Sequence, residues 1–236
     1  MITSGLNNPE SVACDKDGNF FIADRANGAI KKWTASTRAV TVLASGLISP
    51  SGVAVAQNGD VYFSQTDAGS GALTRWSAAT GAVTDVVTSG FNKPWGVAMH
   101  GEDAVVIANL FGKSVSMWKM TTGALKTLFT VTNSFADGAV AVVTDSSGDV
   151  YSSFPTANQV WKWSAQSESA SVLLDAPLLG NSHARALDMD AKGNLIIGFD
   201  VSPSLGHHFH FLSLWQRESL HVASDRPRVL SCRNAP

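Results

Sequence analysis

Short hydrophobic runs that alternate with polar residues, or are rich in β-branched residues, follow one another along this chain. In the first unit the runs are SVACD (11–15), FFIAD (20–24), AIKKW (29–33) and AVTVLAS (39–45). Turn residues separate the runs, and no segment keeps an apolar period of 3.6 for long enough to make a good helix. The pattern therefore predicts an all-β chain built of short strands.

This set of four runs is repeated. GLNNPESVACDKDGNFFIAD (5–24) is echoed by GLISPSGVAVAQNGDVYFSQ (46–65) and GFNKPWGVAMHGEDAVVIAN (90–109), and weaker copies lie at 138–154 and 185–199. The turn after the first run of each copy repeats every 41 to 45 residues, at Gly18, Gly59, Asp103, Gly148 and Gly193. Four antiparallel strands at this spacing are the signature of a β-propeller blade.

We therefore predict an all-β fold, a β-propeller of four-stranded antiparallel blades, with five blades visible. The blades are expected at about 5–45, 46–89, 90–130, 131–174 and 175–216, followed by an atypical C-terminal strand or tail at 217–236. Residues 1–5 match the last strand of a unit, and pairing them with the last blade would close the ring and remove an exposed edge. The ring is either five-bladed or a truncated six-bladed one.

A tryptophan ends the third run of every copy. These residues are Trp33, Trp76, Trp118, Trp163 and Trp215. Regular spacing in every copy is what packing demands, so we interpret the column as core between neighbouring blades and not as an aromatic cage for a ligand.

The pattern P-x-G-V-A-V, then G-D-V-Y, then I-K-K-W resembles the NHL-repeat type of propeller. It is also similar to the related gluconolactonase-like, strictosidine-synthase-like and virginiamycin-B-lyase-like six-bladed propellers. The resemblance covers roughly residues 1–199. It implies the architecture far more than the chemistry, because function belongs to the site and not to the fold.

The stretch CDKDGNFFIAD (14–24) looks like the start of a calcium loop. An EF-hand loop that began at Asp15 would need Gly at its sixth position and Glu at its twelfth, but Gly18 falls fourth and Ala26 twelfth. What recurs in the copies is Gly with Asn, Asp or Ser neighbours, and not the order of ligands that a calcium loop needs. The stretch is therefore predicted to be a hairpin turn, in which Gly supplies a positive φ.

If that turn is structural, function is expected on the opposite face, where loops entering the first strand lie beside loops joining the second and third. Two columns of residues that do not repeat fall there: Glu10, Ser51, Trp95, Val140 and Arg185, and then Asp24, Gln65, Asn109, Phe154 and Phe199. Ordinary surface variation is the alternative explanation. Our candidate ligand-binding residues are Asp24, Gln65, Trp95, Asn109, His183 and Arg185.

The resemblance to gluconolactonase-like enzymes implies a glutamate at a blade entry, with Asn and Asp from other blades, around a divalent cation. Glu10 in NPES resembles that glutamate, Asp137 in FADGAV resembles the aspartate, and Asn109 would supply a neutral oxygen. Three such oxygens suit Ca²⁺, Mg²⁺ or Mn²⁺, and the ion would polarise a lactone or ester carbonyl. On this interpretation Glu10 and Asp137 are catalytic.

Histidines give a weaker indication of chemistry. The lyase-like relatives use a centre that contains histidine, and His183 enters the fifth blade at the same mouth, although a surface or capping role is the simpler interpretation. His207, His208 and His210 in HHFH are read as a loop or irregular strand with adventitious metal affinity. No G-x-S-x-G or similar arrangement supports nucleophilic catalysis.

Composition and charge narrow the range of partners. The formal net charge of the 236 residues is −2, so no general attraction to nucleic acid or membrane is expected. Apolar runs are far shorter than a bilayer span, and no signal-peptide pattern opens the chain. Cys14 and Cys232 are read most simply as two unpaired thiols, with a disulfide between the chain ends as the alternative. The compartment stays undetermined.

We therefore expect a monomeric binding scaffold that presents one face to a protein, peptide or glycan and needs no cofactor. Trp95, Arg185 and an exposed Phe111 are residue types common in binding hot spots. The alternative is a divalent-metal-dependent hydrolase or lyase, with its site at the central mouth of the propeller.

Overall fold

The computed structural model describes residues 5–132, 138–175, 182–190, 192–201, 209–214 and 220–223. Its strands form five four-stranded antiparallel sheets, and in each sheet the strands are paired in chain order. The predicted β-propeller of four-stranded antiparallel blades is confirmed.

The sheets are named blades 1 to 5 in chain order. Blade 1 contains β1 (Pro9–Cys14), β2 (Phe20–Asp24), β3 (Ala29–Trp33) and β4 (Val40–Ala44). Blade 2 contains β5 (Pro50–Val55), β6 (Val61–Gln65), β7 (Ala72–Trp76) and β8 (Val83–Val87). Blade 3 contains β9 (Pro94–His100), β10 (Ala104–Asn109), β11 (Ser114–Lys119) and β12 (Leu125–Thr130). Blade 4 contains β13 (Val142–Thr144), β14 (Val150–Phe154), β15 (Gln159–Ser164) and β16 (Ser169–Asp175). Blade 5 contains β17 (Ser182–Met189), β18 (Leu195–Val201), β19 (Phe209–Leu214) and β20 (Leu220–Ala223).

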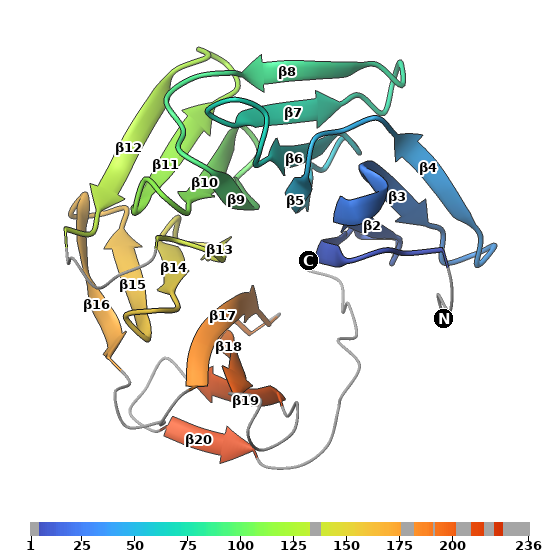
Figure 1. Ribbon diagram of the computed structural model, residues 1–236. Helices are drawn as coiled ribbons and strands as arrows, with labels where there is room; N and C mark the ends of the chain where they lie inside the picture. Colours follow the sequence, from blue (N-terminus) through green and yellow to red (C-terminus); the bar gives the residue numbers. More distant parts are fainter. Residues whose placement is uncertain are drawn as a thin grey trace.

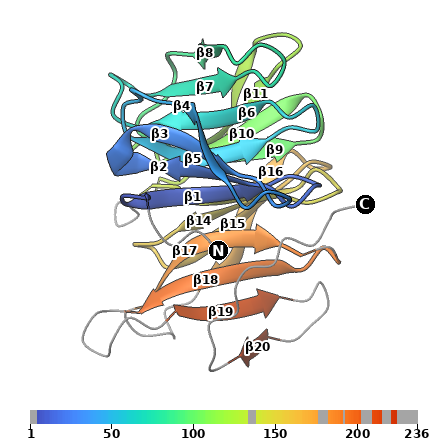
Figure 2. The ribbon, with the colours of Figure 1, turned by 90° about the vertical axis from the view of Figure 1, so that its right-hand side faces the viewer.

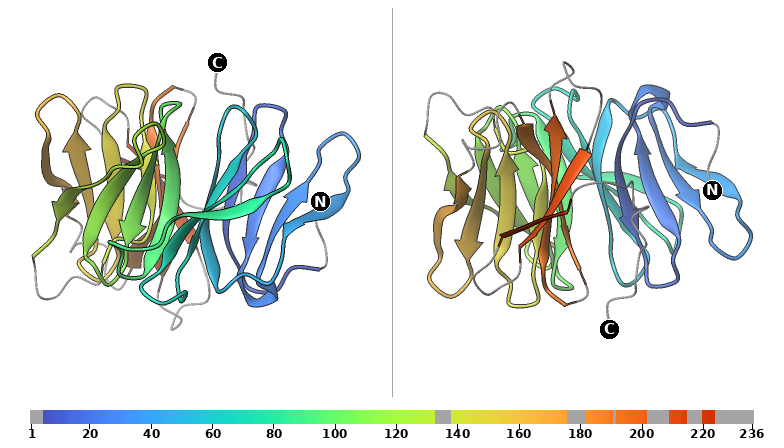
Figure 3. Two further views of the ribbon diagram at one scale, coloured as in Figure 1. Left: turned by 90° about the horizontal axis from the view of Figure 1, so that it is seen from above. Right: turned by 90° about the horizontal axis from the view of Figure 1, so that it is seen from below.

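The blades stand around a common centre, with the first strand of each blade innermost and the fourth outermost (Figure 1). Seen from the side, the strands run between the two faces of a disc (Figures 2 and 3). The described sheets do not close the ring, because a gap separates blade 5 from blade 1 (Figure 1). Residues 1–4, which make up most of the predicted closing strand, lie outside the described residues.

The hydrophobic core lies between neighbouring blades. Phe21, Ala23 and Ile30 of blade 1 pack against Val53 and Phe63 of blade 2, and similar clusters join blades 2 and 3, 3 and 4, and 4 and 5. The predicted packing of the tryptophan column is confirmed at three positions, which are Trp76, Trp118 and Trp163. Trp215 lies outside the described residues.

The turn between the first and second strands is held by side-chain caps. Asp15 Oδ1 accepts the backbone N–H groups of Asp17 and Asn19 at 3.0 and 2.9 Å, and Gly18 has a φ of 76°. Asn19 Oδ1 in turn accepts the N–H of Ala35, in the turn between β3 and β4, at 2.9 Å. The acidic stretch is therefore a hairpin turn, as predicted, and Asp15 binds backbone amides.

Other blades repeat this hydrogen bond, which joins the turn after the first strand to the turn after the third strand. We call this bond the bracket. Asp60 in blade 2 and Asp149 in blade 4 each accept the N–H of the matching alanine, Ala78 or Ala165, at 2.8 Å. Blade 3 has Ala104 at this position, and there the backbone carbonyl of Asp103 accepts the matching N–H, that of Met120, at 2.8 Å. The bracket is therefore a recurring part of the fold that one blade makes with backbone atoms alone.

Two further expectations concern the cysteines and membrane-spanning segments. Cys14, the last residue of β1, is disulfide-bonded, so the simpler interpretation of unpaired thiols is corrected; Cys232 lies outside the described residues. Within the described ranges no helix is long and apolar enough to span a membrane.

Candidate functional site

The loops that enter the first strands and the loops that join the second and third strands share one face of the disc, as predicted. Arg25, in the short 3-10 turn η1 (Arg25–Asn27) after β2, contacts Glu10 at the start of β1. Lys93, just before β9, contacts Asp67 in the loop after β6. This side of the disc is called the entry face, and the opposite side, with the hairpin turns at 15–19 and its copies, is the turn face.

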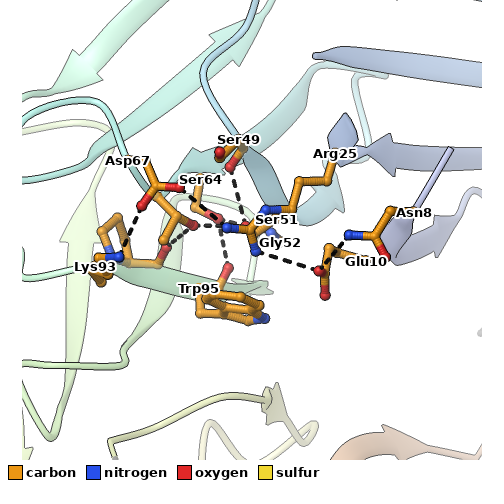
Figure 4. A network of polar contacts seen from close by, with 12 residues as sticks. Asn8, Glu10, Arg25, Ser49, Ser51, Gly52, Ser64, Asp67, Lys93 and Trp95 are labelled. Atoms are coloured by element: carbon orange, nitrogen blue, oxygen red, sulfur yellow. Dashed lines mark hydrogen bonds and ion pairs between the residues drawn. The ribbon is translucent and has the colours of Figure 1, made fainter. Parts of the chain in front are cut away.

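Four charged side chains from three blades form a chain of ion pairs on the entry face (Figure 4). The Arg25 guanidinium lies 3.4 Å from a Glu10 oxygen and 3.2 Å from an Asp67 oxygen. The Lys93 ammonium lies 3.0 Å from the other Asp67 oxygen. The Arg25 side chain is only 21% exposed, whereas those of Asp67 and Lys93 are 35% and 39% exposed. The series of ion pairs thus runs from the half-buried Arg25 to the more exposed Lys93.

Two aromatic rings lie beside the cations. The Arg25 guanidinium stands 4.7 Å from the centre of the Trp95 ring, and the Lys93 ammonium stands 4.9 Å from that of Phe111. Both distances fall within the range of a cation–π contact. Trp95 is half-buried, whereas Phe111 is 59% exposed. Together Glu10, Arg25, Asp67, Lys93, Trp95 and Phe111 are called the entry-face cluster.

Blade 2 fixes the backbone that carries Trp95. The hydroxyl of Ser64 donates to the Trp95 carbonyl at 2.6 Å (Figure 4). The hydroxyl of Thr66 donates to the Pro94 carbonyl at 2.8 Å. A Cβ on Gly52 would lie 2.2 Å from the Trp95 carbonyl oxygen, so only glycine permits this close approach of β5 and β9. The tryptophan is therefore held on a rigid element.

Asp67 is the carboxylate that two cations share. Its pKa lies below its ordinary value, because Ser49 and Lys93 donate hydrogen bonds to the carboxylate and the charges of Lys93 and Arg25 favour the ionised form. Asp67 therefore stays ionised at neutral pH and links the loops of three blades.

Asp24, a candidate ligand-binding residue, is placed inside blade 1. Its side chain is wholly buried, and its carboxylate accepts the Asn7 N–H and the Asn27 side-chain amide, each at 2.7 Å. The Lys31 ammonium lies 2.6 Å from it. Burial alone raises the pKa of Asp24, but the Lys31, Asn27 and Asn7 hydrogen bonds more than offset burial and hold that pKa below its ordinary value.

Gln65 and Asn109, the matching candidates in blades 2 and 3, are also buried. Gln65 accepts the Ile48 N–H at 2.9 Å and donates to Thr74 at 2.9 Å, so it joins the entry loop to the third strand just as Asp24 does. Asn109 donates to Ser116 at 3.2 Å. Asn109 Oδ1 is a buried acceptor with no hydrogen-bond partner among the described residues.

The other candidates are spread over the ring. His183 is half-buried, and its Nδ1 lies 2.9 Å from the Pro155 carbonyl oxygen. Arg185 is exposed on blade 5. Asp137, His207 and His208 lie outside the described residues. Within the described ranges, no hydrogen bond or ion pair joins Glu10, Asn109 and His183.

The described residues supply only part of the cation site that the resemblance implies. No group of three or more His, Cys, Asp or Glu residues in the described ranges is arranged to hold a metal ion. Glu10 is engaged with Arg25 and with the Asn8 amide at 3.4 Å. Asn109 Oδ1 is the one candidate ligand atom in this described set that is buried and unpartnered.

Sequence reasoning placed Glu10 and Trp95 on the correct face but missed Arg25, Asp67 and Lys93. These three residues follow or precede the columns by one or two positions, in ADRAN, SQTDAG and NKPWG. The sequence did carry a signal for these three residues, because each is a charged residue in a loop whose other residues repeat between the copies. Adjacent loops of opposite charge would have predicted the ion pairs between blades.

The geometry can be compared with solved structures. A catalytically inactive virginiamycin B lyase from Staphylococcus aureus with quinupristin aligns with a TM-score of 0.72 at 13% identity, over 94% of this chain and 71% of that one. The nidogen/laminin complex gives 0.71 at 11% identity, over 87% and 75%, and a streptogramin B lyase gives 0.66 at 16% identity, over 88% and 68%.

These comparisons define the class of protein as a β-propeller. More particularly, it is a propeller of the type seen in the virginiamycin B and streptogramin B lyases and in nidogen, as the repeat pattern predicted. No protein-family model and no curated protein matches the sequence. At these identities the likeness shows the fold alone.

Proposed function

We propose that the chain is a propeller scaffold that binds a protein, peptide or glycan on its entry face. The observation that carries the proposal is the entry-face cluster, in which Trp95 and Phe111 stand beside ion-paired Arg25 and Lys93. These residues come from blades 1, 2 and 3. A ligand that touches all of them would therefore contact three neighbouring blades and not a single loop.

The chemistry of the cluster suits recognition of a mixed polar and apolar surface. Tryptophan and arginine are among the residues enriched in binding hot spots. Phe111, at 59% exposed, offers an apolar contact that solvent now covers. The ion pairs hold Arg25 and Lys93 in place before a ligand arrives, which reduces the ordering that binding would require.

The nidogen neighbour gives independent support for protein binding by this fold, because the solved structure is a complex with laminin. The candidates Asp24 and Gln65 would contribute indirectly, by fixing the loops before β1 and β5. Arg185 and His183 would extend the same surface toward blade 5.

Binding to printed peptide and glycan arrays tests the proposal. We expect wild type to bind a defined subset of features, and Phe111→Ala and Trp95→Ala each to weaken that binding about tenfold, as a hot-spot loss of more than 1 kcal/mol would. Leu173→Ala on β16, which also removes an exposed apolar side chain (44%), is the matched control and should bind as wild type does. Equal binding by all four proteins would refute the entry face as the site.

The second candidate function is a divalent-metal-dependent hydrolase or lyase, which the unpartnered Oδ1 of Asn109 favours. Asn109, Glu10 and Asp137 would hold the cation, which would polarise a lactone or ester carbonyl. Calorimetry with Ca²⁺, Mg²⁺ or Mn²⁺ alone would then show micromolar binding that Glu10→Gln abolishes and Glu102→Gln, an exposed control, preserves. Absence of heat with all three ions in wild type would exclude this function.

A further inference from the structure

The entry-face loops of blade 3 are more basic than those of blade 2. In blade 3 these loops are 88–93, before β9, and 110–113, between β10 and β11. They contain two lysines, Lys93 and Lys113, and no acidic residue. The matching loops of blade 2 contain one acidic residue, Asp67, and no basic one. Blade 3 therefore brings two positive charges to the entry face, of which Lys93 pairs with Asp67.

Both lysines occupy positions where the repeat uses a left-handed backbone. Lys93 has a φ of 54° and Lys113 a φ of 49°. At the position of Lys93, blade 1 has Asn8 and blade 2 has Ser49. At the position of Lys113, blade 4 has Asn158 and blades 1 and 2 have glycine. Asparagine and glycine adopt this conformation more readily than lysine does. Lysine at both positions therefore costs conformational energy that the fold does not require, which points to a role for the charge.

Two exposed apolar side chains accompany the lysines. Phe111 is 59% exposed, which is the largest exposed fraction among the large hydrophobic residues that the structure describes. The Lys93 ammonium stands 4.9 Å from the centre of the Phe111 ring, and the Lys93 side chain is 39% exposed. The same ammonium pairs with Asp67, to which Ser49 donates a hydrogen bond. Ile48, the residue before Ser49, is 53% exposed. Positive charge and apolar surface therefore adjoin on this part of the entry face.

We propose that the entry face binds an acidic segment of another protein, in which carboxylates flank an apolar side chain. This inference rests on the proposed binding function and specifies the chemistry of its ligand. The carboxylates would pair with Lys93 and Lys113, and the apolar side chain would pack on Phe111 and Ile48. The Lys93 ammonium has three N–H donors, so it can keep its contact with Asp67 and also bind a carboxylate of the ligand.

A protein segment suits this surface better than an acidic glycan. A sugar ring packs on an open aromatic face, but each ring of the entry-face cluster has a cation over one face. Arg25 stands over Trp95, which is also half-buried, and Lys93 stands over Phe111. Ile48 is aliphatic and suits the apolar side chain of a peptide. Aliphatic, aromatic and cationic side chains together therefore favour a peptide ligand.

Two matched sets of peptides on the printed array test the proposal. In the acidic set two glutamates flank a phenylalanine or a leucine, and in the neutral set glutamines replace both glutamates. Each exposed ion pair should strengthen binding by up to about fivefold, so wild type should prefer the acidic set by about tenfold. Added salt should reduce this preference, because the charges are partly exposed.

The asparagine that other blades use in place of these lysines removes the charge and suits the left-handed backbone. The double variant Lys93→Asn/Lys113→Asn should bind both peptide sets equally, with the affinity that wild type has for the neutral set. Unchanged binding of the neutral set also shows that the variant is folded. Lys119→Asn, at an exposed lysine on β11 of the same blade, is the matched control and should keep the preference.

The possible outcomes separate the acidic specificity from the binding function on which it rests. Equal binding of both peptide sets by wild type, or a preference that survives in the double variant, would overturn the acidic specificity and leave the binding function standing. Binding to glycan features alone would do the same. Binding to no feature of either array would overturn both.

Discussion

The two faces of the propeller use polar residues in opposite ways. On the turn face the same bracket recurs inside single blades, as in Asn19 with Ala35 and Asp60 with Ala78. On the entry face the polar contacts differ from blade to blade and cross between blades, as in Arg25 with Asp67. Repetition thus marks residues that build the blade, and charge that does not repeat marks residues that join the blades and shape the surface.

A third group lies between these two. Asp24, Gln65 and Asn109 do not repeat, yet they are buried and the first two perform one task, which is to fix the entry loop against the third strand. Variation of residue type therefore does not by itself indicate a ligand site, because a buried tether can be built from several polar side chains.

Acid should destabilise both faces at once, and this is the largest effect we expect. The pKa values of Asp24 and Asp67 on the entry side and of Asp149 on the turn side lie below the ordinary value of 3.8. A lowered folded-state pKa adds stability that is present above the ordinary value and is lost as pH falls through the folded value. Urea unfolding should therefore give a free energy that is constant from pH 6 to about 5 and falls steeply below about 4.

Variants show which face carries this acid response. Asp67→Asn and Asp149→Asn should each make the loss of unfolding free energy below pH 4 less steep, because each removes one carboxylate with a lowered pKa. Asp17→Asn, at an exposed residue of the first turn, is the control variant. If neither of the first two variants alters the steepness, the acid response comes from elsewhere in the chain.

Loss of the Asp24 carboxylate should be the most damaging single substitution. Asp24→Ala removes the acceptor for the Asn7 N–H and leaves Lys31, whose side chain is 11% exposed, without its ion partner. Breaking one side of a buried pair costs about 3–5 kcal/mol of unfolding free energy. Urea unfolding at pH 7 measures this loss, and Asp17→Ala is the control that should change it by less than about 0.5 kcal/mol.

The sequence predicted the fold well because its signal is redundant. Five copies of one strand order place the turns, and the tryptophan column marks the core, so single departures such as Ala104 do not hide the repeat. The site was predicted less well. Glu10 and Trp95 fall on the correct face, but burial of Asp24 and Gln65 depends on the loops that pack over them, and the Arg25–Asp67 pair joins residues 42 positions apart. No local pattern encodes such contacts.

The bracket on the turn face should matter less than the buried pair at Asp24. Asp60→Ala leaves the Ala78 N–H without its acceptor and removes the partner of Arg75. Ala78 is exposed, so water replaces part of the lost bond, and we expect a loss of about 0.5–1.5 kcal/mol, the net contribution of an ordinary hydrogen bond. Blade 3 folds without a side-chain acceptor at this position, because the Asp103 carbonyl accepts the equivalent N–H. Blade 2 should therefore also stay folded in Asp60→Ala. Thermal unfolding compares Asp60→Ala with Asp60→Asn, which keeps the Oδ1 acceptor and should lose less.

The entry-face cluster should contribute least to stability, because its charged side chains are partly exposed, at 21–39%, whereas that of Asp24 is wholly buried. Arg25→Ala removes two partly exposed ion pairs and the contact with Trp95, for a loss of about 1 kcal/mol. A double-mutant cycle with Trp95→Ala should give a coupling of about 0.5–1 kcal/mol, which added salt barely changes, whereas the contribution of the ion pairs should shrink with salt. Lys119→Ala, an exposed cation on β11, is the control. A loss above about 3 kcal/mol for Arg25→Ala would show that this cluster stabilises the fold as the buried tethers do, and the distinction between the two kinds of polar residue would fail.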